Sequence, residues 1–163
     1  MKKLKSQAGM TLGEVLISVL ILLMLTAIVA EGIPLAQRAY YKVVDSANAQ
    51  VLLSDTLTVL RDELSMTSSV PVCNGSGDTS SITYYSEKQG KMVTLPAKTD
   101  IGTTDYGLVS SGLSKKQKLV VQFNSVSISD GKVTFANLNV AKEGDVNHPL
   151  AEINSLIIKV LNS

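Results

Sequence analysis

The first part of the chain carries an unbroken hydrophobic pattern. Residues Val15–Ala30 include no charged side chain, and if the span is counted from Met10 it contains one charge, Glu14. As a helix rising ~1.5 Å per residue, this span extends roughly 30 Å, which matches the hydrocarbon core of a bilayer. The pattern predicts an apolar helix half over residues 10–33 that crosses a membrane.

A second helical pattern, amphipathic rather than uniformly apolar, is predicted over residues 34–67, because apolar residues recur every three or four positions. Its predicted apolar stripe comprises Ala36, Tyr40, Val43, Ala47, Val51, Leu53, Leu57, Leu60 and Leu64. Gly32 and Pro34 lie where the two patterns meet. Proline removes a backbone donor, so we expect a helix kink at these two residues. A free-standing coiled coil is the alternative, but the apolar spacing does not hold a heptad.

Short strand patterns follow the helix, after a predicted loop over residues 73–78. The predicted strands are Ser81–Tyr85, Lys91–Leu95, Tyr106–Val109, Leu119–Phe123 with an extension toward Ile128, Lys132–Val140 and Ile153–Leu161. Asp130-Gly131 is typical of a type I′ hairpin turn. One long helix followed by hairpin-linked strands predicts an α+β fold, in which the N-terminal α-helix packs on a C-terminal antiparallel β-sheet. The β-rich head is expected over residues 68–163.

The charge distribution places the N-terminus. Lys2, Lys3 and Lys5 precede the apolar span, so the positive-inside rule puts the N-terminus in the cytoplasm and the rest of the chain outside. The net charge is +1, and removal of residues 1–9 with their three lysines makes it −2. This balance gives no electrostatic case for binding nucleic acid.

The junction between leader and span has the order Gly9-Met10-Thr11-Leu12-Gly13-Glu14. With the short basic leader before it and the apolar run after it, this junction resembles the class III signal of type IV pilins and pseudopilins. Five of the six positions fit the pattern of that family. Gly13 departs from it, because an aliphatic residue is usual there. The chain has a single cysteine, which excludes an intrachain disulfide. In lacking this disulfide, the chain is more similar to the Gram-positive members of the family.

The resemblance implies a function and a set of partners. The chain would be a structural subunit of a type IV pilus or pilus-like filament, made as a single-pass precursor in the cytoplasmic membrane and later displayed at the cell surface. A prepilin peptidase would cut the Gly9–Met10 bond and methylate the amine of Met10. Further partners would be other pilin subunits, an assembly ATPase and a platform membrane protein. The implied subunit is no enzyme and uses no cofactor.

Glu14 is expected to act in assembly. An unpaired carboxylate costs about 3 kcal/mol at the centre of a membrane helix and less near its ends. The α-ammonium of Met10 on a neighbouring subunit would offset that cost, since a charge pair in a low dielectric is favoured over a lone charge. Methylation keeps the positive charge, so the pairing would survive it. Snorkelling of the carboxylate to the interface is the alternative.

Candidate chemistry elsewhere is sparse. Cys73 as a nucleophile would need a base, and the single histidine is His148. Acidic residues at Glu143–Asn147 offer oxygen ligands of the kind that Ca²⁺ takes, although the spacing is not that of an EF-hand, and solvated turn acids are the favoured interpretation. No catalytic or metal site is predicted.

Four other interpretations of the chain stay open at this stage. One is a secretory signal cleaved near Thr26–Ala30, and another is an uncleaved single-pass anchor; both leave the motif around Glu14 unexplained. A pseudopilin of a type II secretion or competence DNA-uptake machine would carry the same N-terminal signal. An anchored or secreted binding module, in which the β-rich head holds a ligand, is the alternative of another class.

Overall fold

A computed structural model describes residues 11–102 and 118–161 of the chain. Gly9, Met10 and the strand predicted at Tyr106–Val109 lie outside the described residues. The chain forms two compact units, residues 1–42 and residues 43–163. Each unit is considered by itself below.

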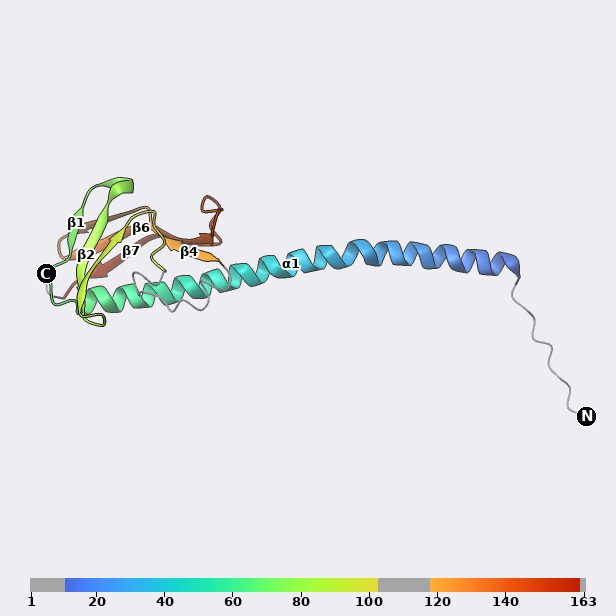
Figure 1. The fold of residues 1–163 in the computed structure, drawn as a ribbon, viewed down its shortest axis with the longest axis horizontal. Helices are drawn as coiled ribbons and strands as arrows, with labels where there is room; N and C mark the ends of the chain where they lie inside the picture. Colours follow the sequence, from blue (N-terminus) through green and yellow to red (C-terminus); the bar gives the residue numbers. More distant parts are fainter. Residues whose placement is uncertain (1–10, 103–117, 162–163) are drawn as a thin grey trace, which may run out of the picture. The chain divides into compact units, whose positions relative to one another are not determined.

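Helix α1, Leu12–Met66, is the longest element and belongs in part to each unit (Figure 1). It ends at Met66, as predicted from the polar run that follows. The helix continues through Gly32 and Pro34, so the kink expected at these residues stays a prediction. After the helix, the Thr67 hydroxyl donates a 2.9 Å hydrogen bond to the carbonyl oxygen of Tyr85, which joins the helix end to the first sheet.

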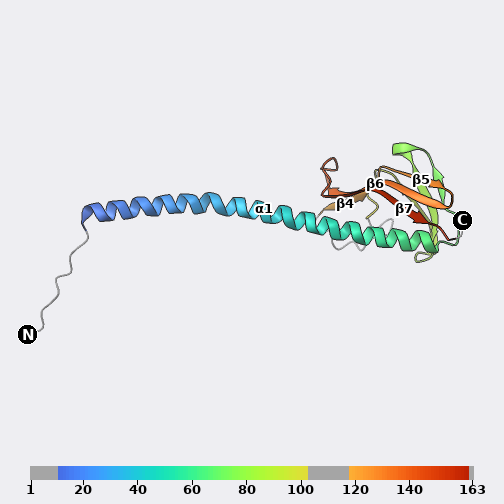
Figure 2. The ribbon, with the colours of Figure 1, turned by 180° about the vertical axis from the view of Figure 1, so that it is seen from behind.

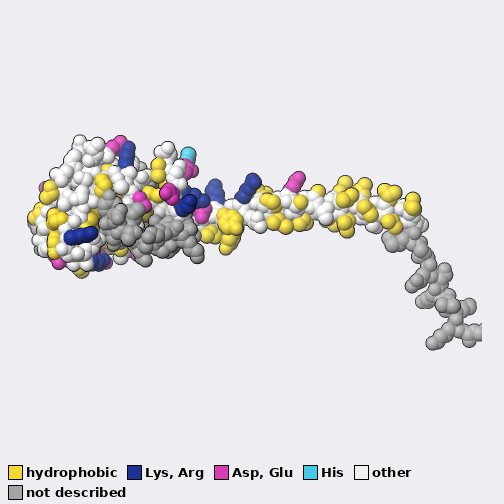
Figure 3. Space-filling model, in the orientation of Figure 1, with side chains coloured by type: hydrophobic (Ala, Val, Ile, Leu, Met, Phe, Trp, Pro, Cys, Tyr) yellow, Lys and Arg dark blue, Asp and Glu magenta, His cyan; other side chains and the backbone are white. Residues whose placement is uncertain are grey.

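In the unit of residues 1–42, the described part is the N-terminal stretch of α1, and its side chains are exposed. Hydrophobic side chains are spread along the visible face of this stretch, and a few charged side chains appear on its half nearer residue 42 (Figure 3). By length and composition the helix can cross a membrane, and the candidate window lies near the N-terminus with none of its residues buried.

The described residues of the unit 43–163 form two antiparallel sheets rather than the single sheet predicted. The first sheet has the order β1-β2-β3, formed by β1 Val72–Asn74, β2 Ser81–Ser86 and β3 Lys91–Pro96. The second is formed by β4 Leu119–Gln122, β5 Ser125–Ser129, β6 Lys132–Lys142 and β7 Ala151–Lys159. Figures 1 and 2 show both sheets beside the C-terminal part of α1. The α+β fold predicted from the sequence is therefore confirmed.

Strand β6 is the central strand of the second sheet. Strand β7 pairs along one edge of β6. Strands β4 and β5 pair one after the other along its opposite edge. The register does not shift between them, since Val121 is opposite Val140 and Val126 is opposite Phe135. The predicted type I′ hairpin is present between β5 and β6, because Asp130 and Gly131 both have positive φ, 50° and 68°.

The outer edge of β4 is covered by the segment that follows β3. Lys98 donates its backbone N–H to the carbonyl oxygen of Phe123, and Ile101 donates to Val121, each over 2.8 Å. The N–H of Val121 in turn donates to Oδ1 of Asp100 at 3.0 Å. Backbone groups on this side of β4 are thus already hydrogen-bonded.

Three of the predicted strand and loop boundaries were wrong. The segment 119–128 is not one strand but β4 and β5, separated at Phe123 and Asn124. The final strand is Ala151–Lys159 rather than Ile153–Leu161. The predicted loop 73–78 contains strand β1 and a 3₁₀ turn, η1 Gly77–Thr79, because the chain there pairs with β2.

The core lies between the C-terminal part of α1 and the two sheets. Its helix residues include Leu52, Leu60 and Leu64, and its sheet residues include Phe123 and Phe135, whose rings meet edge to face at a centroid distance of 5.1 Å. Burial of such side chains supplies most of the driving force for folding.

The predicted apolar stripe of the helix is not one continuous stripe. Val43 and Val51 are 68% and 56% exposed, whereas Leu53 is 6% exposed and belongs to the core. Successive residues turn by about 100° on a helix, so Val51 and Leu53 lie on nearly opposite sides. The predicted members Ala36, Tyr40 and Ala47 are also exposed. Leu60 and Leu64 are buried and Leu57 packs against the core, as predicted.

Candidate functional site

The start of α1 forms a reciprocal cap built from Thr11 and Glu14. The backbone N–H of Thr11 donates to Oε2 of Glu14 at 2.9 Å, and the N–H of Glu14 donates to Oγ1 of Thr11 at 3.4 Å. The carbonyl oxygen of Thr11 accepts the first helical hydrogen bond, from Val15. This is the capping box of a Thr-x-x-Glu sequence, in which two otherwise unpaired helix donors are satisfied.

The cap determines how the Glu14 carboxylate is placed. Its Oε2 atom also accepts a 3.2 Å hydrogen bond from the hydroxyl of Thr11, and the helix N-terminus next to it carries a partial positive charge. The Glu14 side chain is otherwise exposed. The carboxylate therefore has a local role in starting the helix and still faces outward, where a cation can approach it.

Gly13 lies inside the same capped turn. A Cβ atom added there meets no other atom within 4 Å among the described residues. Packing within the subunit therefore does not require a glycine at this position.

The structure thus places one of the three predicted N-terminal site residues. Glu14 is at the helix start, whereas Gly9 and Met10 lie outside the described residues. Sequence reasoning missed the capping role of Glu14, although the signal was present, since Thr11 precedes Glu14 by three positions immediately before an apolar run.

A second candidate feature is the face of α1 that the core of the head leaves uncovered. Within residues 43–66, the buried side of the helix carries Ala49, Leu52 and Leu60, while Val43 and Val51 point away from the core and are exposed. Exposed valines are ordinary when single, but these two are separated by two helical turns and so lie on the same side.

Cys73 and His148, considered above as a nucleophile and its base, do not have the properties of such a pair. Burial raises the pKa of the Cys73 thiol, which disfavours the reactive thiolate. The Nδ1 atom of His148 is 2.7 Å from Oδ1 of Asp145. Cys73 is on β1, in the other sheet from the strands that flank the His148 loop.

The loop Glu143–Asn147 is closed by a backbone bridge and by a side-chain contact. Lys142 and Asp145 form an isolated bridge across its turn, and the Asp145 carboxylate is engaged by His148. In the part of the chain that the structure describes, no group of three or more His, Cys, Asp or Glu residues is arranged to hold a metal ion.

The chain was compared with models of protein families, with curated proteins and with solved structures. None of the three comparisons gave a match.

Proposed function

We propose that this chain is a structural subunit of a type IV pilus or pilus-like filament. It is inserted in the membrane as a precursor, cut after Gly9, methylated at Met10 and then polymerised through its helix. The resemblance of residues 9–14 to the class III signal supports the proposal, and so does the α+β architecture of one long, partly apolar helix packed on antiparallel sheets.

The observation that carries the proposal is that exposed apolar surface on α1 extends well past one membrane span. A span needs about 20 residues, which Leu12–Ile33 supplies. Beyond it, Tyr40 and Tyr41 are 65% and 63% exposed. Tyrosine rings at this distance also suit the membrane interface of a single-pass anchor. Exposed apolar side chains further along α1, at Val43 and Val51, are buried only if helix packs against helix.

The same side-chain pattern continues in the head unit. Val43 and Val51 are exposed on the side of α1 away from the core. Burial of apolar surface contributes about 25 cal/mol for each Å² removed from water. Contacts between helices of neighbouring subunits are the proposed source of that burial.

Glu14 is proposed to set the register of those contacts. Its carboxylate faces outward from the helix cap and would attract the α-ammonium of Met10 on the next subunit. The cap complicates the usual alanine test, because alanine removes both the charge and the hydrogen bonds to Thr11.

Two substitutions separate these roles. Glu14→Gln keeps an acceptor for the N–H of Thr11, since glutamine also forms capping boxes, but removes the charge. Thr11→Val removes the capping hydroxyl, at a cost of about 1 kcal/mol in helix stability, and keeps the charge. We expect Glu14→Gln to insert and be cleaved normally but to be absent from sheared filaments, whereas Thr11→Val is incorporated.

The measurements are immunoblots of membranes and sheared filaments, together with the intact mass of the mature chain. A mature chain that begins at Met10 with one added methyl group is expected. Normal incorporation of Glu14→Gln refutes the charge-pairing step. A cellular chain that keeps residues 1–9 and never enters a filament refutes the proposal as a whole.

The helix surface has its own test. Val51→Lys places a charge on the exposed apolar side, and Gln50→Lys is the matched control at an exposed polar neighbour. Both variants are expected to fold, because neither side chain is in the core. Only Val51→Lys should reduce filament yield, and equal yields from the two variants contradict a helix-packing role for this side.

A further inference from the structure

The outer face of the second sheet contains a polar depression of about 570 Å³, a volume in the range of small-molecule sites. Most of the side chains that line it are carboxamides. The sheet contributes Gln122, Asn124, Asn137 and Asn139, and the loop after β6 contributes Asn147. We call this depression the asparagine groove.

The register of the sheet explains why the carboxamides gather there. Gln122 is the partner of Asn139 across β4 and β6, and Asn139 is the partner of Glu152 across β6 and β7. Side chains two positions apart on a strand point to the same face. Asn124 and Asn137, two positions along the chain from Gln122 and Asn139, line the same depression and add a second row beside the first.

Two oxygens in these rows have no partner among the described residues. They are the Oδ1 atoms of Asn137 and Asn139, and both are buried. Asn139 is 5% exposed in total, and its Nδ2 group contacts the carbonyl oxygen of Asn137 at 3.4 Å. Buried polar atoms are nearly always hydrogen-bonded, so these two oxygens have unused capacity to accept a hydrogen bond from a water or a hydroxyl that enters the groove.

The strand backbone beneath the groove is locally irregular. Asn137 has a φ of 53°, in the left-handed region that asparagine tolerates better than most residues. This conformation occurs in the middle of the central strand, between the partners of β4 and those of β5. An irregular residue of this kind re-aims side chains and is often found next to functional sites.

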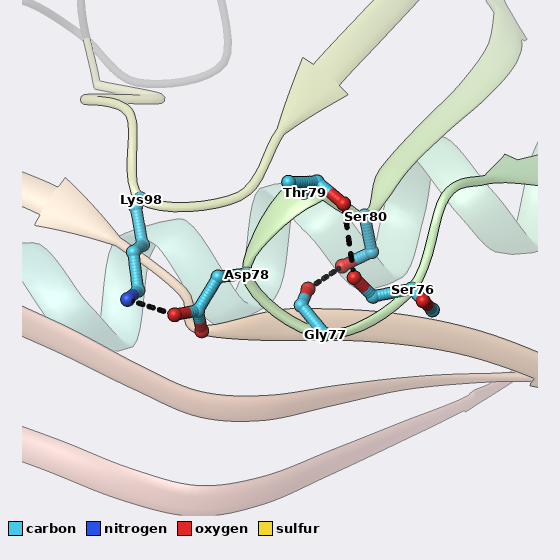
Figure 4. A network of polar contacts seen from close by, with 6 residues as sticks. All are labelled: Ser76, Gly77, Asp78, Thr79, Ser80 and Lys98. Atoms are coloured by element: carbon cyan, nitrogen blue, oxygen red, sulfur yellow. Dashed lines mark hydrogen bonds and ion pairs between the residues drawn. The ribbon is translucent and has the colours of Figure 1, made fainter.

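The walls of the groove carry two charged side chains, one lysine and one glutamate. Lys98 lies at one side, but its ammonium group is engaged by the carboxylate of Asp78, as Figure 4 shows. Glu152 contributes one negative charge, and Val146 and Pro149 contribute apolar surface. With its single lysine already paired, the groove does not favour a phosphate or another anion.

We propose that the asparagine groove binds a neutral oligosaccharide. Each carboxamide offers two N–H donors and one acceptor oxygen, which match hydroxyl groups that both donate and accept. Rotation about the broad χ2 torsion of Asn137 or Asn139 turns its Oδ1 toward an incoming hydroxyl. An extended peptide fits less well, since the groove is on the face of a sheet whose backbone groups pair in the plane of the strands.

This site does not depend on the polymerisation proposed above. Saturation-transfer difference NMR on the full-length chain tests it, in a detergent without a sugar headgroup so that the detergent does not compete. The probes are neutral oligosaccharides of glucose, galactose, mannose and N-acetylglucosamine. An oligogalacturonate and a tetra-alanine peptide serve as the acidic and peptide probes.

At least one neutral oligosaccharide is expected to bind. Asn139→Ala should weaken its affinity at least tenfold, and Asn124→Ala, at a less buried position, should weaken it severalfold without loss of fold. Asn74→Ala is the matched control, because Asn74 is an exposed asparagine in the first sheet, and its affinity should be unchanged. Far-UV circular dichroism verifies that each variant is folded.

Three results overturn the inference. The first is that none of the neutral oligosaccharides binds. The second is that one binds with equal affinity to the wild type and to Asn124→Ala. The third is that the acidic or the peptide probe binds in place of the neutral sugars.

Discussion

Tyr84 provides a test of how the core treats a polar group. This β2 side chain is 0% exposed, and its hydroxyl has no hydrogen-bond partner among the described residues. Burial raises the pKa of Tyr84 well above its usual value, and the nearby carboxylate of Glu63 raises it further. Glu63 itself is buried, with Lys88 at 3.6 Å as its ion-pair partner. The change considered is Tyr84→Phe.

The sign of the pH effect follows from proton binding. Above about pH 10 a tyrosine in the unfolded chain releases its proton, whereas Tyr84 in the folded chain keeps it. The unfolded state then binds fewer protons, so the free energy of unfolding falls as pH rises. The fall is about 1.4 kcal/mol for each pH unit between the usual pKa of tyrosine and the raised pKa of Tyr84. Below pH 10 this contribution to stability is fully present.

Tyr84→Phe should remove this part of the alkaline loss. At neutral pH the variant should be no less stable than the wild type, because an unsatisfied buried hydroxyl costs about 1–3 kcal/mol and phenylalanine has no such group. Glu63→Gln should reduce the alkaline loss without abolishing it, since burial is the larger cause of the raised pKa.

Urea unfolding of the full chain in detergent, followed by circular dichroism from pH 8 to about pH 11, measures these slopes. Tyrosinate absorbance of the folded protein provides a second readout, in which one tyrosine should ionise only on unfolding. Equal alkaline slopes for the wild type and Tyr84→Phe refute the reasoning, as does ionisation of every tyrosine at its usual pH.

Three further predictions concern the head. Leu60→Ala should lower the free energy of unfolding by about 2–5 kcal/mol, because Leu60 is 0% exposed. Val51→Ala, on the exposed side of the helix, should change it by less than about 0.5 kcal/mol. Urea titration of the two variants compares these values. Gly75→Ala should cost more than Gly77→Ala, since both have positive φ but only the first places a Cβ atom 2.5 Å from a backbone oxygen; thermal unfolding ranks them. The thiol of Cys73 should react with iodoacetamide more slowly than a free cysteine at pH 8, because its pKa is raised; equal rates would contradict this.

Local signals in the sequence predicted the elements that depend on neighbouring residues. The helix end at Met66 follows from the polar run after it. The hairpin at Asp130 and Gly131 follows from a dipeptide that adopts positive φ at low cost. Strand β6 was identified by its alternation, and the structure extends it to Lys142.

Features that depend on tertiary contacts were missed. The apolar residues of α1 were combined into one stripe, because spacing alone does not show that the phase changes between Val51 and Leu53. Strand β1 was assigned to a loop because three residues carry too little pattern, and its pairing with β2 is what makes it a strand. The break between β4 and β5 at Phe123 was equally hidden.

The two candidate sites also differ in whether local sequence or tertiary contacts form them. The cap at Glu14 is local, and its signal was present in Thr11. The asparagine groove is assembled from segments around residues 98, 122, 138 and 149, which the fold brings together. No spacing in the sequence relates Gln122 to Asn139, since only the register of the sheet makes them partners.

The covered outer edge of β4 affects how neighbouring heads interact when they are crowded together. In a filament of the kind proposed, many identical heads are held at very high local concentration. Open strand edges under those conditions invite chains to join into intermolecular sheets, as in amyloid. The hydrogen bonds from Lys98 and Ile101 to Phe123 and Val121 occupy this edge, so adjacent heads that touch there can separate again.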